Sequence, residues 1–252
     1  MATFVLVGGA WMGGWVWDHV TRRLRARGHD VYPATLTGLG DRVHLGRREV
    51  DLETHITDVV NLIAVADLRD VYLVGHSYSG IVVTGVADRV SERVSALVFC
   101  DSGPVADGQS WLDLQAPADQ AALRREAEEL GDGWQLLMPD FSELGKGASL
   151  KGLTEADLDV LRRKAAPHPF GTYAQPLRLT RSGPPSYRRV MILCDNGKQL
   201  MPVVRAGLAA GVPQFQAFAG DDWEYHELDT GHWPMLSQPD ELSRLLETLT
   251  RT

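Results

Sequence analysis

Short runs of apolar and β-branched residues alternate with segments of helical periodicity along most of this chain. Six runs have the length of a buried strand: Phe4–Val7, Val31–Ala34, Val71–Val74, Ala96–Cys100, Val190–Cys194 and Glu224–Leu228. The segments with helical spacing are Trp15–Ala26, Glu53–Ala66, Ile81–Val90 and Glu241–Thr250. Because strands that alternate with helices are joined by right-handed crossovers, this order predicts an α/β fold, with a mostly parallel sheet of about six strands flanked by helices.

The alternation breaks off between residues 104 and 186. That stretch contains two helical patterns, Ala118–Leu130 and Thr154–Ala165, and no convincing strand. The second pattern opens with the capping box Thr154-x-x-Asp157. We therefore predict a core made of residues 1–103 and 187–252, with a helical cap inserted at 104–186. Ligands of open α/β sheets bind outside the carboxyl edge, so we expect the insertion to act as a lid there. Peripheral helices without a gating role are the alternative.

Composition limits the partners. The 252 residues carry 25 Lys and Arg against 33 Asp and Glu, a net charge of −8. Such a chain, without basic runs, gains nothing from counterion release, so we expect no nucleic-acid partner. The opening residues 1–7 are typical of a strand rather than a signal peptide, and no apolar run has the length of a membrane span. We therefore expect no membrane partner and a cytoplasmic location, while a homodimer stays open.

Cysteine and metal chemistry are not predicted. Two cysteines, Cys100 and Cys194, cannot build a disulfide framework, and each ends an apolar run, where a buried reduced thiol is expected. No cluster of His, Cys and Asp has the spacing of metal ligands. We expect no cofactor.

The most specific motif is the sequence Gly-His-Ser-Tyr-Ser-Gly at residues 75–80, which joins the third predicted strand to a helix. This is the context of a nucleophile elbow, a tight turn that lifts Ser77 above the sheet. The turn requires small residues two positions before and after the serine, and Gly75 and Ser79 meet that requirement. The backbone N–H of Tyr78 would then point at a developing oxyanion. An ordinary strand–helix turn with an N-capping serine is the alternative.

A serine nucleophile needs a base, and His232 is the candidate among eight histidines. It follows the last predicted strand and precedes the final helix, where the base belongs when the chain order is Ser, acid, His. A loop histidine that only caps is the alternative. His76 is expected to be structural, and His44 and His55 to support a pocket indirectly. Surface or helix positions are expected for His19, His29, His168 and His226.

The acid that orients the base has two candidates. Asp101 and Asp195 each come directly after a predicted strand, and each could equally cap a loop. The second oxyanion donor is expected from the glycine-rich loop after the first strand, where the N–H of Ala10 is our candidate. The glycines of this loop are not spaced G-x-G-x-x-G, so a dinucleotide site is not predicted.

Tryptophans in the candidate pocket and lid segments predict a hydrophobic, aromatic substrate. The expected pocket residues are Gly9, Trp11, Trp111, Trp134 and Trp233. Core packing is the alternative for each tryptophan.

Five segments together carry a family resemblance. They are residues 4–17, the sequence Thr-Leu-Thr-Gly-Leu-Gly-Asp-Arg at 35–42, the elbow at 75–80, Val-Phe-Cys-Asp at 98–101 and Gly-His-Trp-Pro-Met-Leu-Ser at 231–237. On these segments the chain resembles the α/β-hydrolase superfamily. Within it, the chain is similar to the esterase and hydroxynitrile-lyase-like group that includes plant methyl-salicylate esterases and bacterial pyrethroid hydrolases. The resemblance implies Ser77 as nucleophile, His232 as base and the insertion as a cap over an apolar pocket.

The chain departs from that pattern in several places. Gly8, Met12 and Ser79 stand where the family usually has His, His and Gly. Trp233 stands where the lyases of the group have a lysine, which favours the esterase branch.

The departure with the largest consequence is Gly197, which holds the usual position of the acid, three residues after Cys194. Other α/β-hydrolases carry their acid after the earlier strand, so Asp101 is preferred and Asp195, which would need a different loop, is the alternative. A hydrogen bond from one of them to His232 would decide between them.

Three functions follow. The first is a serine hydrolase that cleaves an ester of a hydrophobic small molecule through an acyl-enzyme on Ser77. The second keeps the fold but uses His232 as the base of a cyclase, lyase or C–C bond-forming enzyme acting on a natural product. The third is a small-molecule-binding protein without catalysis.

Overall fold

The computed structural model describes residues 1–181, 183 and 185–251. Six strands form one parallel sheet in the order β2-β1-β3-β4-β7-β8. They are β1 (Thr3–Val7), β2 (Asp30–Ala34), β3 (Val71–His76), β4 (Val94–Cys100), β7 (Arg188–Leu193) and β8 (Trp223–Glu227). The predicted α/β fold is confirmed, and each predicted strand is found with its ends shifted by at most two residues.

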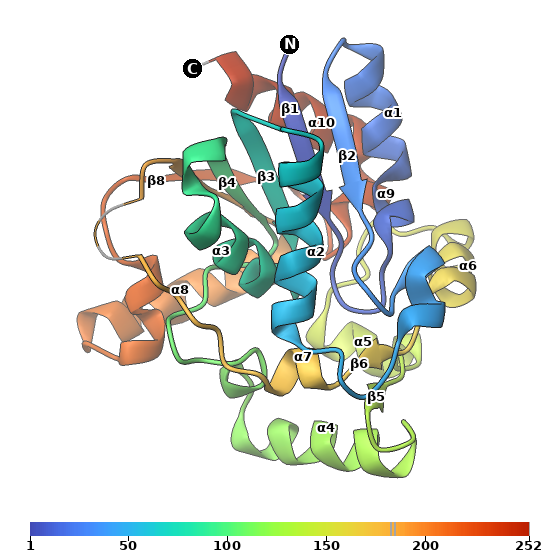
Figure 1. The fold of residues 1–252 in the computed structure, drawn as a ribbon. Helices are drawn as coiled ribbons and strands as arrows, with labels where there is room; N and C mark the ends of the chain where they lie inside the picture. The colour runs from blue at the N-terminus through green and yellow to red at the C-terminus, as the bar shows by residue number, and fades with distance from the viewer. Residues whose placement is uncertain (182, 184, 252) are drawn as a thin grey trace.

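Helices cover both faces of the sheet (Figure 1). One face carries α2 (Leu52–Val65), α3 (Ser79–Arg89) and α8 (Asp195–Ala209), and the other carries α1 (Asp18–Ala26), α9 (Pro234–Ser237) and α10 (Pro239–Thr248). The strands alternate between the two cores: Phe4 and Leu6 pack with α1 and α10, while Val5 and Val7 pack with α2 and α3. Burial on both faces explains why these strands are continuous apolar runs.

Helix α8 was not predicted. It follows β7 directly and contains Gly197, Pro202 and Gly207, residues that lower helix propensity and obscure its pattern. Met201 and Val204 nevertheless hold it against the sheet, because both are buried in the same core as α2 and α3. Tertiary packing has therefore overridden local propensity. The helix matters for function because its first turn faces the candidate site.

Between β4 and β7 the chain forms a segment that we call the insertion, residues 104–186. Its helices are α4 (Pro117–Glu129), α5 (Phe141–Gly147), α6 (Glu155–Lys164) and α7 (Gly171–Ala174). The capping box predicted at Thr154 and Asp157 is confirmed. The prediction that the insertion has no strand is wrong, because β5 (Gln135–Leu136) and β6 (His168–Pro169) pair antiparallel. Two-residue strands are too short to show a period of two in the sequence.

The insertion lies across the carboxyl ends of the strands, with α4 farthest from the sheet (Figure 1). Backbone hydrogen bonds attach it to the core: the N–H of Gly231 donates to Lys151 O (3.0 Å), that of His232 to Ser149 O (2.7 Å) and that of Ala166 to Trp11 O (2.9 Å). The insertion therefore contacts both the loop after β1 and the loop that carries His232.

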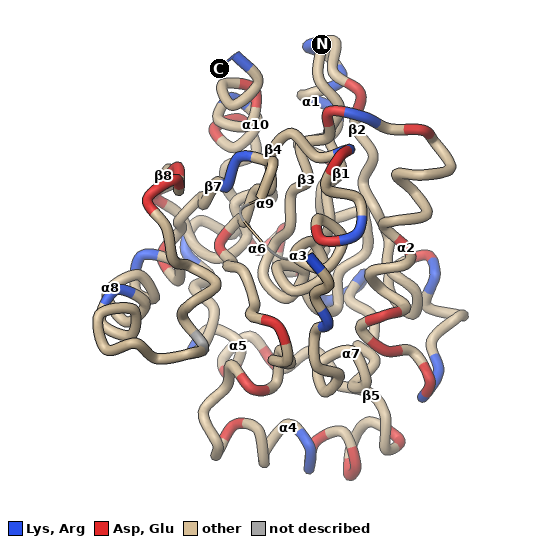
Figure 2. The backbone as a smooth tube through the Cα atoms, turned by 60° about the vertical axis from the view of Figure 1, so that its left-hand side comes forward, with Lys and Arg blue, Asp and Glu red and all other residues tan. Residues whose placement is uncertain are grey.

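Short 3-10 helices complete the described elements: η1 (Gly14–Trp17), η2 (Gly40–Leu45), η3 (Ser91–Arg93), η4 (Leu112–Leu114), η5 (Pro213–Phe218) and η6 (Leu249–Arg251). Figure 2 shows basic and acidic positions interspersed along the outer elements. Within the described ranges, no helix combines the length and apolar character needed to cross a bilayer.

Candidate active site

The turn between β3 and α3 has the backbone of a nucleophile elbow. Ser77 adopts a φ of 52°, a left-handed conformation that is rare and costly for a residue with a side chain. A Cβ on Gly75 would lie 2.5 Å from Cγ2 of Val83, so this position must be glycine. Ser79 is tolerated because its hydroxyl lies against two backbone carbonyls, of Val7 and His76, at 2.9 Å each.

His232 hydrogen-bonds to one of the two candidate acids. Its Nδ1 lies 2.6 Å from Oδ2 of Asp101, whose side chain is fully buried. Asp101 follows β4 with a φ of 45°, and this turn directs its carboxylate toward His232. At 2.6 Å this is a short hydrogen bond. The structure therefore brings together His232 and the acid that the sequence preferred.

The second oxygen of Asp101 is held by the first turn of α8. Oδ1 accepts hydrogen bonds from the backbone N–H groups of Cys194 (3.0 Å) and Gly197 (2.7 Å). These two amide donors hold the carboxylate in place at the N-terminus of α8. A Cβ on Gly197 would lie only 2.9 Å from Oδ1. The glycine at the usual position of the acid is thus the residue that makes room for an acid from another strand.

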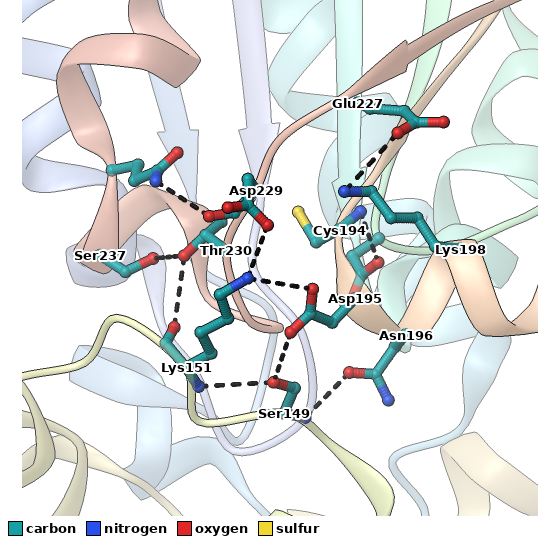
Figure 3. A network of polar contacts seen from close by, with 12 residues as sticks. Ser149, Lys151, Cys194, Asp195, Asn196, Lys198, Glu227, Asp229, Thr230 and Ser237 are labelled. Atoms are coloured by element: carbon teal, nitrogen blue, oxygen red, sulfur yellow. Dashed lines mark hydrogen bonds and ion pairs between the residues drawn. The ribbon is translucent and has the colours of Figure 1, made fainter.

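Asp195 takes part in a different network, which joins the first turn of α8 to the insertion and to the loop after β8 (Figure 3). Its Oδ2 accepts a hydrogen bond from Ser149 Oγ (3.1 Å), and its Oδ1 lies 3.8 Å from Nζ of Lys151. Lys151 also pairs with Asp229 at 2.6 Å, and that hydrogen bond lowers the pKa of the Asp229 carboxyl. Among the described residues, Asp195 makes no hydrogen bond or ion pair with His232. It fastens the insertion to the core.

The loop after β1 lies directly beside the elbow. A Cβ on Gly9 would lie 2.9 Å from Cβ of Ser77, so glycine is required for this close approach. Among the described residues, no hydrogen bond engages the backbone N–H of Ala10 or that of Tyr78. Trp11 has a φ of 63° and is fixed by hydrogen bonds to the insertion.

His76 supports the loop of His232. Its Nε2 lies 2.7 Å from the carbonyl oxygen of His232, which can only accept, so this nitrogen carries the proton. The two rings are 4.7 Å apart. Burial, followed by the proximity of His232, lowers the pKa of His76 well below its ordinary value. The structural role expected for His76 agrees with these contacts.

A cavity of about 890 Å³ opens beside these residues. Ser77, Asp101 and His232 line it, together with four of the five predicted pocket residues, Gly9, Trp11, Trp111 and Trp233. Trp134, the fifth, is not among the lining residues. It stands just before β5, where its carbonyl accepts a hydrogen bond from Phe170 (2.8 Å). Further aromatic side chains in the lining are Tyr173, Phe215 and Phe218.

The sequence matches the family model described as "Alpha/beta hydrolase family" over residues 4–245. The chain belongs to the alpha/beta hydrolase family. A carbendazim hydrolyzing esterase from Nocardioides sp. (strain SG-4G) is 36% identical, over 99% of this chain and 100% of the esterase. The putative methylesterase 14, chloroplastic, of Arabidopsis thaliana is 25% identical, over 96% of this chain and 70% of that protein.

A solved extracellular alpha/beta-hydrolase from a Paenibacillus species superimposes with a TM-score of 0.81, at 22% identity and 98% coverage of each chain. At that identity the likeness concerns the fold. The family resemblance inferred from the motifs is confirmed. Membership of the family and the end-to-end similarity to an esterase place this hydrolase among carboxylic ester hydrolases.

Several residues of this hydrolase's site were missed by sequence reasoning. Ser102 donates its hydroxyl to the carbonyl of Ser77 (2.5 Å) and lines the cavity. His168 was expected at a surface or helix position but is fully buried and contacts Trp11. The two prolines that flank His168 in the sequence were a signal of a fixed loop that could have drawn attention to it.

The described residues contain no group of three or more His, Cys, Asp or Glu that could hold a metal ion. Cys100 and Cys194 are free and buried, as expected, and burial raises the pKa of both thiols.

Proposed function

We propose that this hydrolase cleaves carboxylic esters through an acyl-enzyme on Ser77, with His232 as general base and Asp101 as the acid that orients it. The observation that carries the proposal is the 2.6 Å hydrogen bond between His232 Nδ1 and Asp101 Oδ2, at the wall of a cavity that Ser77 also lines. Asp101 can only accept at neutral pH, so His232 donates from Nδ1 and presents Nε2 as the basic nitrogen.

The reaction then proceeds in two halves. His232 Nε2 takes the proton of the Ser77 hydroxyl as Oγ attacks the ester carbonyl, and the resulting imidazolium donates that proton to the departing alcohol. Water, deprotonated by His232, attacks the acyl-enzyme, and Ser77 recovers its proton as the acid is released. Asp101 stabilises the imidazolium in each half, since its charge is fixed by the first turn of α8.

The negative charge that develops on the carbonyl oxygen needs donors. The N–H groups of Ala10 and Tyr78 are the candidates because both adjoin the elbow and have no other partner among the described residues. In other acyl-transfer enzymes, one such donor is worth about 2.7–4 kcal/mol of transition-state stabilisation. That magnitude makes the position of these two amides decisive for the rate.

The cavity supports a substrate that is hydrophobic and contains an aromatic ring. Its volume of about 890 Å³ suits a small organic molecule. Trp11 and Trp233 line it from the core side, and Trp111 and Tyr173 from the insertion. We propose that the insertion acts as a cap that excludes water from the bound ester, because it supplies one wall of the cavity.

The test uses short aryl esters and an aryl phosphonate that labels activated serines. Wild-type protein should turn over the esters and gain one phosphonyl group at Ser77, located by mass spectrometry of peptides. Ser77→Ala should lose both properties. Ser91→Ala, which changes a buried serine in η3 at the opposite end of α3, is the matched control and should keep both.

Full activity of Ser77→Ala, with no labelling of the wild type, would refute the acyl-enzyme. Turnover of a non-ester substrate without a covalent intermediate would support the alternative in which His232 acts as base in non-hydrolytic chemistry. Tight binding without turnover would point to a binding protein.

A further inference from the structure

Two buried histidines, which have no role in the proposed reaction, form hydrogen bonds close to the two proposed oxyanion donors. The N–H of Trp11, the residue after Ala10, donates to Nδ1 of His168 at 3.3 Å. The hydroxyl of Tyr78 lies 3.0 Å from Nδ1 of His55. His168 belongs to β6 of the insertion and His55 to α2 of the core, so the two supports come from different parts of the fold.

The hydrogen-bond partners assign one tautomer to each ring. Because a backbone N–H can only donate, Nδ1 of His168 is unprotonated, and its Nε2–H donates to Oγ1 of Thr172 (2.8 Å). The Thr172 hydroxyl in turn donates to the carbonyl of Pro169 (2.8 Å). In this series of hydrogen bonds, from Trp11 through His168 and Thr172 to Pro169, each donor therefore faces an acceptor.

The same reasoning applies to His55. Its Nε2 lies 2.9 Å from the carbonyl oxygen of Thr37, which can only accept, so Nε2 carries the proton. Nδ1 then accepts the hydrogen bond from the Tyr78 hydroxyl. Both histidines are thus neutral rings with an unprotonated Nδ1 that accepts a hydrogen bond. His168 accepts it from Trp11, the residue after Ala10, and His55 accepts it from the side chain of Tyr78.

Burial preserves these acceptors. His55 and His168 are both fully buried, and their rings meet edge to face at 5.8 Å. Burial lowers the pKa of His55 to about 4 and the pKa of His168 well below its ordinary value. A protonated ring would have no lone pair for the Trp11 amide or the Tyr78 hydroxyl.

Trp11 needs this support because its backbone is strained. Its φ of 63° is unfavourable for a residue with a Cβ, and such strain persists only when neighbouring contacts hold it. Three contacts do so, all from the insertion: His168 on the N–H, Ala166 on the carbonyl (2.9 Å) and Leu136 on the indole Nε1 (3.0 Å). The peptide that joins Ala10 to Trp11 is therefore positioned by the insertion. It is attached to the Cα of Ala10, and this restrains the preceding peptide, which carries the Ala10 N–H.

We propose that His168 and His55 are positioning residues of the oxyanion hole: His168 fixes the amide of Ala10 through Trp11, and His55 fixes Tyr78 through its hydroxyl. The inference rests on the proposed function, since it assigns the hole to Ala10 and Tyr78. It adds that the hole is complete only when the insertion is seated on the core, because His168 comes from the insertion.

The experiment compares variants by turnover of an aryl ester and by affinity for phenylboronic acid, which forms a tetrahedral anion on a reactive serine. His168→Leu removes the acceptor for Trp11. Deleting an oxyanion donor costs about 10²–10³ in kcat, and displacing one should cost less, so we expect roughly a tenfold fall in kcat. KM should change little, and boronate affinity should fall by the same factor as kcat. His168→Asn, whose Oδ1 replaces Nδ1 as acceptor, should recover most of the loss.

His29→Leu is the matched control. Nδ1 of His29 also accepts a backbone N–H, from Ala2 at 3.2 Å, and the side chain is also buried, but it lies at the opposite edge of the sheet. This variant should lose stability without losing kcat or boronate affinity. Equal kcat and boronate affinity in folded His168→Leu and wild type would overturn the proposal, as would equal losses in His29→Leu.

Two milder variants keep the test decisive if His168→Leu does not fold. Thr172→Val removes the partner of His168 Nε2, and Tyr78→Phe removes the hydroxyl that His55 holds. Each should lower kcat and boronate affinity together, by a smaller factor than His168→Leu. Unchanged values in both would overturn the inference. If wild-type protein itself binds no boronate and takes no phosphonate at Ser77, it is the proposed function that fails, a distinguishable result.

Discussion

Asp101 and Asp195 each follow a cysteine at the carboxyl end of a strand, and their strands, β4 and β7, are neighbours in the sheet. Asp101 turns with a positive φ, its side chain is fully buried, and its carboxylate reaches His232. Asp195 enters α8 directly, a quarter of its side chain is exposed, and it contacts Ser149 and Lys151. The dipeptide Cys-Asp thus occupies the same position after both strands but has two roles. Where the chain turns, the aspartate is buried and pairs with His232; where the chain begins a helix, the aspartate links the insertion to the core.

The largest expected effect separates the two aspartates directly. Asp101→Asn should lower kcat/KM by roughly 10³–10⁴, because an amide in this place favours the wrong tautomer of the base. Asp195→Asn should lower it less than about threefold, since the side chain of Asp195 bonds to Ser149 and Lys151 and not to His232. Steady-state kinetics on one aryl ester measures both. Equal or reversed losses would overturn the assignment of the acid.

Lowering the pH should act on the buried histidines that hold Tyr78 and Trp11 before it acts on the network of Asp195. Burial lowers the pKa of His55 from 6.5 to about 4, so between these values the unfolded chain binds a proton that the folded chain does not. The free energy of unfolding should therefore fall as the pH decreases from 6.5 to 4, by roughly 3 kcal/mol for this group. His76 and His168, whose pKa values burial also lowers, add to the loss.

Around Asp195, by contrast, the hydrogen bond between Lys151 and Asp229 raises the pKa of the lysine and lowers that of the aspartate, so both stay charged in this window. Urea unfolding between pH 7 and pH 4 measures the loss. His55→Gln, which keeps a donor and an acceptor, should show a shallower dependence. A dependence equal to that of the wild type would show that His55 is not responsible. The charged and titratable groups around His55 are Arg42, Asp51, Asp58, Tyr78 and His168.

Gly197 provides a sharper test of how the first turn of α8 serves Asp101. A Cβ at this position would lie 2.9 Å from Oδ1 and push the carboxylate away from His232. Gly197→Ala should therefore lower kcat by about tenfold, equivalent to about 1.4 kcal/mol. Gly145→Ala is the control: its Cβ would lie 3.3 Å from Cδ1 of the Leu150 side chain, Gly145 does not line the cavity, and kcat should stay unchanged. An unchanged kcat in Gly197→Ala would show that Asp101 can move without cost.

The smallest effect concerns the fastening at Asp195. Ser149→Ala removes the hydroxyl that donates to Asp195, and we expect a loss of at most about 1 kcal/mol in the free energy of unfolding. The backbone carbonyl of Ser149, which holds the His232 amide, remains, so kcat should change little. A large loss of kcat with normal stability would mean that the Asp195 network controls the base after all.

The strands and the elbow were predictable because each depends on residues that are close together in the sequence. Runs of four or five residues, most of them apolar, predict the strands, and Gly75 and Ser79, each two positions from Ser77, predict the turn. His232 was predictable from its place after the last strand. Helix α8 was not, because Gly197 and Pro202 obscure its periodicity and its packing comes from residues distant in the sequence.

The choice between Asp101 and Asp195 could not be derived from local pattern, because both follow strand, Cys, Asp. It depends on a left-handed turn at Asp101 and on amides contributed by residues 194 and 197, more than ninety positions away. The absence of an acid at Gly197 was visible in the sequence, but its reason, that the backbone there receives the acid of β4, required the structure. His168 was missed in the same way, since its contact with Trp11 spans 157 positions.

The attachment of the insertion to the core has a consequence for engineering substrate range. Three of its contacts with the core loops, at residues 149, 151 and 166, run through the main chain, so these three depend on the path of the backbone and not on side-chain identity. Segments exchanged between relatives should therefore be spliced outside these anchor points, leaving the backbone that carries them unchanged. Side chains of α4 that do not line the cavity can then be varied, because the anchors and His168 keep the geometry of the base and of the first loop.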